Sequence, residues 1–380
     1  MGNLCNKDDL REETKSTLET TFSIKKLKCR ASTNSNASNS TLGECGVILA
    51  FKDDSSYINV QPEYGLSLVD KGKEIYAAEL PNNDFNDVIC VKGVYYISEA
   101  STGIWLKSAD SSKPELFKEI PGLTGSIGRV LRAGYSGQVL FAMKNSQSLI
   151  AMRLDLEKSM PGRVYEDVIE EITRSGSGSG ETDGIHAEES DLISDYQVFG
   201  EEGDCVVVLQ KSGRLAAYQY FVKRRRSKLL LEHEIKMIKN RPERASALAV
   251  CPKNEYFAVF TDSKDGGEYK CSRAILLQLK EGKIVERGTI NLHVEEFIPF
   301  IYHVVFQKYY NDYLVFSAFN GIEEAMLQTF CYDKKKKEFY EIRKLRKHVD
   351  VPFPGKLVTC GDSLYSSDPD GTLVEISYYY

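Results

Sequence analysis

One short unit recurs along this chain: three apolar strands separated by polar turns. The clearest copy consists of residues 247–252, 256–261 and 274–279. Seven copies can be aligned, with the turn between the second and third strands at Gly65, Gly103, Ser146, Gly213, Gly267, Gly321 and Gly371, roughly 50 residues apart. Tight hairpin turns need a positive φ, which glycine adopts without steric cost. The repeat therefore predicts a series of antiparallel hairpins.

An all-β fold follows from this repeat. Seven units of about 40–50 residues match a seven-bladed β-propeller, in which four-stranded antiparallel blades pack around a central axis. The last copy ends after its third strand, at residues 372–376. We expect residues 21–29, which alternate apolar and polar, to supply its fourth strand and close the ring without an exposed sheet edge. The alternative assignment leaves residues 1–44 as a free tail.

Two segments resemble the WD-repeat class of propellers. Residues 368–373 are similar to the Asp-Gly turn that leads into the third strand of that family, and residues 248–252 to its first strand ending in proline. The resemblance covers about residues 20–380. It implies rigid blades that present variable loops to other proteins. The chain has one tryptophan, Trp105, no Trp-Asp dipeptide and no Gly-His pair, so the hydrogen-bonded tetrad of the family is assigned to no residue here.

The domain organisation follows from composition along the chain. Residues 21–380 are expected to form one propeller domain, preceded by a flexible tail over residues 1–20. Residues 31–44 are polar and are expected to form a loop. Residues 174–193 contain a Ser-Gly repeat and an acidic segment, and they are expected to form a flexible insertion because they have little apolar area to bury. A natural low-complexity loop and an engineered linker both fit the Ser-Gly repeat.

Charge and cysteine usage bear on the compartment and the partners. The 49 basic and 55 acidic residues give a net charge of −6, which argues against a dedicated nucleic-acid binder. The nine cysteines include no CxxC pair, and the chain starts with no export signal. These features predict a cytoplasmic protein with reduced thiols, no zinc site and no cofactor.

The first residues resemble a lipidation signal. Gly2 follows the initiator methionine and Cys5 lies close behind, as in proteins that are both myristoylated and palmitoylated. Asn6 departs from the motif, which prefers serine or threonine there. We take Gly2 and Cys5 as candidate acylation sites, and an ordinary start of a chain as the alternative.

Two basic runs fall in predicted turns between third and fourth strands, and both turns belong to the same face of a propeller as the start of residues 21–29. The predicted basic surface consists of Lys223, Arg224, Arg225, Arg226, Lys228, Lys334, Lys335, Lys336 and Lys337, with Lys280 and Lys283 in the equivalent turn between the two runs. A basic patch beside an acyl chain is the combination that holds a protein on an anionic membrane. The alternative is that charged turns serve only solubility and keep sheet edges unpaired.

No catalytic signature is present. The sequence lacks HExxH, GxGxxG, GxxxxGK[ST] and GxSxG patterns. The leading hypothesis is therefore a non-enzymatic scaffold for protein–protein interaction, tethered to a membrane by its N-terminus and basic turns.

Two alternatives stay open. One is a propeller hydrolase or small-ligand binder that uses the central channel, with His303 as its candidate residue. The other is a structural subunit of a large assembly, in which Tyr309, Tyr310, Tyr378, Tyr379 and Tyr380 would be contact points.

Overall fold

The computed structural model describes the strands and many of the adjoining turns between residues 21 and 379. The longer stretches outside the described residues are 1–20, 28–47, 155–164, 172–191, 293–300 and 350–357, and shorter ones fall in connecting turns. The predicted tail, the polar loop and nearly all of the predicted insertion thus lie outside the described residues. Within the described part, no helix is long and apolar enough to cross a bilayer.

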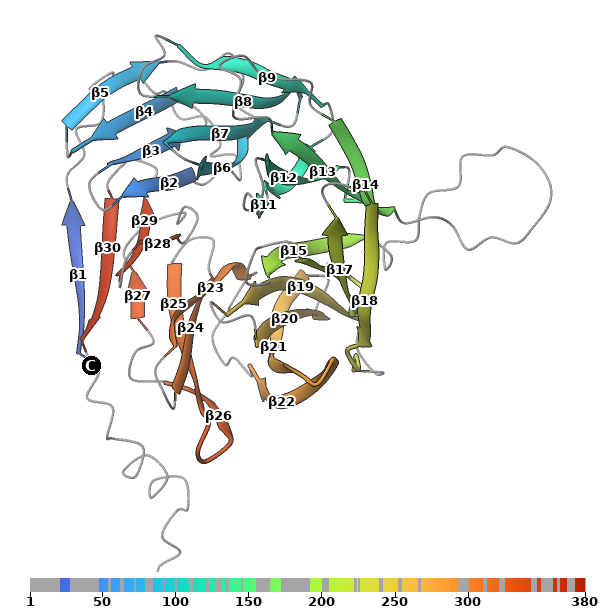
Figure 1. Cartoon of the computed structure of the whole chain (residues 1–380). Helices are drawn as coiled ribbons and strands as arrows, with labels where there is room; N and C mark the ends of the chain where they lie inside the picture. Colours follow the sequence, from blue (N-terminus) through green and yellow to red (C-terminus); the bar gives the residue numbers. More distant parts are fainter. Residues whose placement is uncertain are drawn as a thin grey trace, which may run out of the picture.

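The described strands form seven antiparallel sheets (Figure 1). The first sheet contains β2 (Ile48–Asp53), β3 (Ser56–Gln61), β4 (Gly65–Asp70) and β5 (Lys73–Ala78), and the second β6 (Phe85–Val91), β7 (Val94–Glu99), β8 (Gly103–Ser108) and β9 (Glu115–Glu119). The third contains β10 (Leu123–Ile127), β11 (Leu131–Ala133), β12 (Gly137–Lys144), β13 (Ser148–Leu154) and β14 (Tyr165–Glu171), and the fourth β15 (Ile193–Phe199), β16 (Cys205–Gln210), β17 (Arg214–Phe221) and β18 (Arg226–Glu234). The fifth contains β19 (Glu243–Val250), β20 (Tyr256–Asp265), β21 (Glu268–Lys280) and β22 (Lys283–Asn291), and the sixth β23 (Ile301–Tyr309), β24 (Tyr313–Asn320), β25 (Ala325–Asp333), β26 (Glu338–Glu341) and β27 (Lys347–Val349). The seventh contains β28 (Val358–Cys360), β29 (Ser363–Ser367), β30 (Leu373–Tyr379) and β1 (Thr21–Leu27).

The two ends of the described chain share the seventh sheet. β1 pairs antiparallel with β30 along its whole length, with Thr21 opposite Tyr379 and Leu27 opposite Leu373. The strand therefore begins where predicted and ends two residues earlier, at Leu27. Tyr57 and Val69 of the first sheet also pack against Tyr365 of the seventh, so the first and last sheets are in contact.

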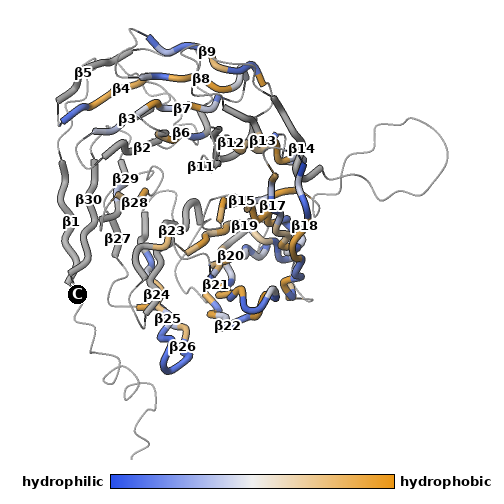
Figure 2. Tube along the Cα trace, in the orientation of Figure 1, coloured by the Kyte–Doolittle hydropathy of each residue, from blue (hydrophilic) through white to orange (hydrophobic). Residues whose placement is uncertain are grey.

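The core lies between neighbouring sheets, which explains the unbroken apolar runs of the sequence. In β16, Val206 and Val208 face the third sheet, whereas Val207 and Leu209 face the fifth. Because both surfaces of this central strand are covered, its residues from Cys205 to Leu209 are all apolar and the alternating pattern of a half-exposed strand disappears. Figure 2 shows the consequence, with hydrophilic stretches gathered at outer strands such as β9, β18 and β26.

The turns predicted between second and third strands all lie between those strands or begin the third one. Gly103 and Gly213 adopt positive φ angles of 139° and 93°, and Ser146 adopts 54°. One predicted boundary is wrong: the insertion was expected to run to residue 193, but Ile193 is buried and begins β15. The isoleucine packs into the core shared by the third and fourth sheets, so it belongs to the domain and not to the insertion.

Candidate functional site

The described members of the predicted basic surface lie in or beside turns between third and fourth strands of three consecutive sheets. We call the edge of the propeller formed by residues 224, 226–228, 280–283 and 334–337 the basic face. Since the sheets share one strand order around the axis, their third-to-fourth turns lie on the same face of a propeller. β1 begins at this edge too, because its first residue lies opposite the last residue of β30.

Some of the predicted basic residues lie in turns, some lie in a strand and some lie outside the described residues. Arg224 lies in the turn between β17 and β18, and Arg226 and Lys228 lie in β18 itself. Lys334, Lys335, Lys336 and Lys337 form the whole turn between β25 and β26. Lys223 and Arg225 lie outside the described residues, as do Gly2 and Cys5.

A buried carboxylate organises the turn of four lysines. Asp333 accepts hydrogen bonds through Oδ1 from the backbone N–H groups of Lys335, at 2.9 Å, and Lys336, at 3.0 Å. The Lys336 ammonium lies 4.0 Å from the other oxygen of the same carboxylate. Aspartate at this position fixes a turn through its own side chain, and it also offsets part of the positive charge. Lys335, Lys336 and Lys337 remain exposed.

The turn of the fifth sheet is a two-residue hairpin with one acidic residue. Glu281 and Gly282 have φ angles of 51° and 74°, the left-handed pair that a type I′ turn requires. The Lys280 ammonium lies 3.8 Å from a carboxylate oxygen of Glu281. Both side chains are largely exposed, so the pair contributes little to stability but does reduce the local positive charge.

The turn of the fourth sheet differs, because it borders a pocket. A cavity of about 380 Å³ is lined by Phe221, Arg224, Arg226, Ser227 and Lys228. β17 and β18 pair up to Phe221 opposite Arg226, which brings the two ends of the turn to this cavity. Among the described residues, the structure gives the side chains of Arg224, Arg226 and Lys228 no ion-pair partner. The pocket differs from the other two turns in that no acidic residue among the described ones lies in its lining.

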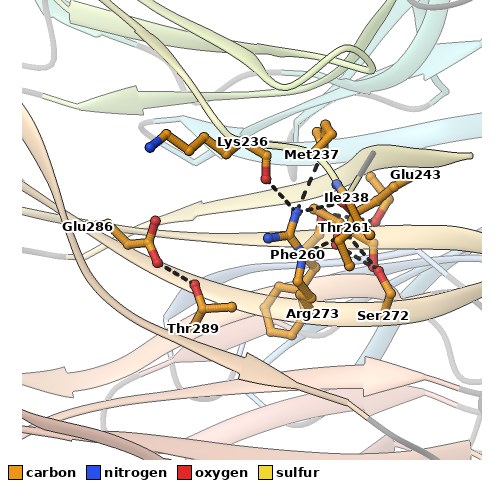
Figure 3. A network of polar contacts seen from close by, with 11 residues as sticks. Lys236, Met237, Ile238, Glu243, Phe260, Thr261, Ser272, Arg273, Glu286 and Thr289 are labelled. Carbon is orange, nitrogen blue, oxygen red and sulfur yellow. Dashed lines mark hydrogen bonds and ion pairs between the residues drawn. The ribbon is translucent and has the colours of Figure 1, made fainter. Parts of the chain in front are cut away.

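A buried polar network occupies the other edge of the fifth sheet (Figure 3). Arg273 of β21 donates two hydrogen bonds to Glu243, the first residue of β19, over 2.7 Å from Nε to Oε1 and 2.6 Å from Nη2 to Oε2. Thr261 and Ser272 donate to the same carboxylate at 2.6 and 3.0 Å. The side chain of Glu243 is fully buried, so its charge is satisfied only from within the protein.

The network also ties down the segment that connects the fourth and fifth sheets. Arg273 Nη2 donates to the carbonyl of Lys236 at 3.0 Å, and the N–H of Ile238 donates to Glu243 Oε2 at 2.7 Å. A second link joins the same two sheets, since the N–H of Leu248 donates to Asp195 Oδ2 at 2.8 Å. These contacts position one sheet against the next and are structural in character.

Two carboxyl groups of this region have shifted pKa values. Burial would raise the pKa of Glu243, but its hydrogen bonds and the charge of Arg273 outweigh burial and hold it below its usual 4.5. Burial raises the pKa of Asp262 to about 6, against a hydrogen bond from Ser246 and the charge of Arg244. Asp262 is 1% exposed, which places it out of reach of a substrate.

The histidines show no catalytic arrangement among the described residues. His303 lies in β23, the innermost strand of the sixth sheet, opposite Phe319, as the channel hypothesis requires, but its side chain lies outside the described part. His233 lies in the outer strand β18, where burial lowers its pKa against the opposing effects of Glu286 and Glu234. In the described part of the chain, no group of three or more histidine, cysteine and carboxylate side chains could hold a metal ion.

The tyrosines proposed as contact points lie at strand ends. Tyr309 ends β23 and Tyr379 ends β30, next to Tyr378, while Tyr310 and Tyr380 lie outside the described residues. Only the backbone positions of Tyr309, Tyr378 and Tyr379 are therefore described.

Sequence reasoning missed the buried network and the full lining of the pocket. Glu243 and Arg273 are 30 residues apart and flank apolar runs, as ordinary surface charges do. Phe221 is not among the predicted site residues, and its position in the pocket follows from the register of β17 against β18. The available signal was the length of the β20–β21 hairpin, in which polar residues alternate beyond the apolar core.

No family model and no curated protein matches this chain. Similar solved structures include the β-propeller domain of Nup133 from Vanderwaltozyma polyspora, with a TM-score of 0.59 and 10% identity over 87% of this chain and 93% of that one. The β-propeller domain of Cps50 (Swd1) from Myceliophteria thermophila gives a TM-score of 0.56 and 10% identity over 90% and 98%. The WD40 β-propeller domain of Doa1 gives 0.53 and 12% over 88% and 94%. At such identities the likeness shows the fold alone, and the fold is that of a WD-repeat-like β-propeller.

Proposed function

We propose that this chain is a non-enzymatic protein-interaction scaffold, held by its basic face on the cytoplasmic surface of a membrane. The observation that carries the proposal is the placement of cationic side chains on third-to-fourth turns of three consecutive sheets, at the edge where β1 begins. A WD-repeat-like propeller suits a scaffold because its rigid sheets present many turns at once, and function resides in those turns.

Charge distribution supports attachment by this face. The whole chain has a net charge of −6, so an anionic membrane would repel it unless cations were gathered on one side. Each basic residue close to an anionic leaflet contributes about 1 kcal/mol. A single myristoyl chain binds only marginally, so acylation at Gly2 would need this second contribution, or palmitoylation at Cys5, for stable attachment.

Metabolic labelling with a myristate analogue, followed by membrane fractionation, tests the tether. We expect label on the full chain and recovery in the membrane fraction, with both lost in Gly2→Ala. Cys5→Ser is the matched variant, expected to keep the label and reduce membrane recovery. Unlabelled protein that is equally soluble in all three forms would refute the tether.

The scaffold part of the proposal has a separate test. In this arrangement the basic face is turned to the membrane, and the edge bearing the second-to-third turns is open to other proteins. Affinity purification with mass spectrometry should recover the same partner proteins with the wild-type chain and with Gly2→Ala, because the partner face is unchanged. Recovery of no reproducible partner by either form would count against a scaffold.

A further inference from the structure

The pocket between β17 and β18 has the chemistry of a phosphate site. Arginine guanidinium groups offer planar pairs of donors that match phosphate oxygens, and lysine adds a compact charge. Arg224, Arg226 and Lys228 line one cavity, together with Ser227 and the aromatic ring of Phe221. We propose that this pocket binds the phosphorylated polyol headgroup of a membrane lipid, an inference that rests on the membrane attachment proposed above and names its ligand.

Comparison with the other two turns of the basic face singles out this pocket. Glu281 lies beside Lys280 in the turn of the fifth sheet, and Asp333 lies beneath Lys336 in the turn of the sixth. Those carboxylates already offset part of the positive charge. Among the described residues, the lining of the β17–β18 pocket includes three cations and no acidic residue. These exposed cations therefore remain available to an external anion.

Charge and volume define the ligand. A phosphomonoester carries about −1.5 to −2 at neutral pH, so roughly two phosphate groups balance three cations. A cavity of about 380 Å³ lies near the lower end of the roughly 300–1,000 Å³ typical of small-ligand pockets. It has room for one phosphorylated ring and not for a folded partner. Phe221 supplies an apolar wall against which the C–H face of such a ring can pack.

Two exposed leucines favour a lipid over a phosphorylated peptide. Leu229 and Leu230 follow Lys228 directly in β18 and are 45% and 43% exposed. The strand has a bulge at this point, since Tyr218 pairs with Leu229 and Ala217 with Leu231, which leaves Leu230 as the extra residue. Apolar side chains next to cations are suited to the boundary between headgroups and acyl chains. A phosphopeptide would make no use of them.

Vesicle binding by unacylated protein tests the proposal without involving the N-terminus. The full chain, produced without the acyl group, is titrated with phosphatidylcholine vesicles containing either phosphatidylinositol bisphosphate or phosphatidylserine at equal total charge. We expect about tenfold tighter binding to the bisphosphate vesicles. The triple variant Arg224→Gln/Arg226→Gln/Lys228→Gln should lose that preference, because it lacks the cationic donors that would hold the phosphate groups of the headgroup.

A matched variant separates the pocket from general charge. Lys280→Gln/Lys335→Gln/Lys337→Gln removes three charges from the same face and should weaken binding to both kinds of vesicle while keeping the preference. Leu229→Ser/Leu230→Ser should weaken vesicle binding and leave binding of soluble inositol trisphosphate unchanged. All of these side chains are exposed or lie in turns, so thermal melts should confirm that the variants stay folded.

The outcomes distinguish this inference from the proposal on which it rests. Equal affinity for the two kinds of vesicle would overturn the headgroup site and leave electrostatic attachment intact. Soluble inositol trisphosphate or a doubly phosphorylated peptide binding as tightly as the lipid, with no effect of the leucine variant, would overturn the membrane source. Preference retained by the pocket variant would place the ligand elsewhere. If the acylated wild-type chain is not recovered in the membrane fraction of cells, the proposed function is refuted instead.

Discussion

Glu243 and Arg273 form a doubly hydrogen-bonded ion pair whose side chains are 0% and 12% exposed. Breaking one partner of a buried pair typically costs about 3–5 kcal/mol, because the other charge is left without compensation. We expect Arg273→Met to lower the free energy of unfolding by that amount at pH 7, measured by urea denaturation. Arg214→Met is the control: its pair with Glu232 is more exposed, so its loss should cost less than about 1 kcal/mol.

The pH dependence of the Arg273→Met variant provides a second check. With Arg273 present, the folded-state pKa of Glu243 is depressed, so the pair stabilises the protein above pH 4.5 and the contribution is lost as the pH falls through the folded value. Without Arg273, burial dominates and the carboxyl group protonates more readily. The difference between wild type and Arg273→Met should therefore shrink in acid. Equal losses for Arg273→Met and Arg214→Met at every pH would contradict the structural role of the network.

Asp262 presents the opposite case, a carboxylate that destabilises the fold at neutral pH. Its Oδ2 atom accepts no hydrogen bond among the described residues and lies 3.8 Å from Arg244 Nε. Burial raises its pKa from 3.8 to about 6, so the folded state binds more protons than the unfolded state between these values, and stability falls as the pH rises through this window. We expect Asp262→Asn to be more stable than wild type at pH 7 by up to about 3 kcal/mol. Urea denaturation from pH 3.5 to 7.5 should show the difference vanish in acid; a difference that stays constant with pH would exclude titration of Asp262 as its cause.

In the hairpins, two glycines with positive φ differ in how much space a side chain would have. A Cβ at Gly103, where φ is 139°, would lie 2.2 Å from the carbonyl oxygen of Lys118 and 2.6 Å from the N atom of Ile120. A Cβ at Gly282, where φ is 74°, would meet nothing within 4 Å. We expect Gly103→Ala to cost about 2–4 kcal/mol, since the outer strand must shift, and Gly282→Ala about 1 kcal/mol for backbone strain alone. Thermal and urea unfolding of the pair would measure this, and similar costs at both positions would refute close packing of β8 against β9 as the reason for Gly103.

The strands and turns could be predicted where the local sequence determines them. Glycines indicate the turns, because positive φ favours glycine, and apolar runs indicate the strands, because burial on both surfaces favours apolar residues. Apolar runs do not mark the part of the β20–β21 hairpin beyond its apolar core, since Thr261, Asp262 and Ser263 are polar and yet buried. Their burial depends on partners such as Glu243 and Ser246, which only the paired strands bring near.

The candidate site, too, could be predicted only in part. The third-to-fourth turns were predicted with their lysines and arginines because the repeat fixes where turns fall. The pocket could not be predicted, since it depends on the register that sets Phe221 opposite Arg226, and the bulge at Leu230 beside it could not be predicted either. Register and bulges arise from contacts between strands, which a single sequence does not display.

Across the whole molecule, each sheet is stabilised mainly by its neighbours. Val206 and Val207 are adjacent in one strand and yet belong to different cores, so the fourth sheet joins the third to the fifth. The aromatic pair Phe260 and Phe330, 5.5 Å apart, similarly joins the fifth sheet to the sixth. A chain of such contacts gains stability when its first and last members also meet, and here Tyr57 and Val69 of the first sheet pack against Tyr365 of the seventh.

The pairing of β1 with β30 can be tested by two truncations that differ by seven residues. Removing residues 1–20 leaves β1 complete, and we expect the urea midpoint to stay at its wild-type value. Removing residues 1–27 deletes β1 and exposes the edge of β30, whose free N–H and C=O groups can pair with another copy. We expect the free energy of unfolding to fall by several kcal/mol, a large share of the roughly 5–15 kcal/mol of a typical domain, and the protein to associate with rising concentration in size-exclusion chromatography.

A synthetic peptide of residues 18–30 should raise the urea midpoint of the shorter chain towards the wild-type value, because it binds the folded state alone. If the two truncations unfold at the same urea concentration, β1 adds nothing, and the contact of Tyr57 and Val69 with Tyr365 must join the first and seventh sheets by itself.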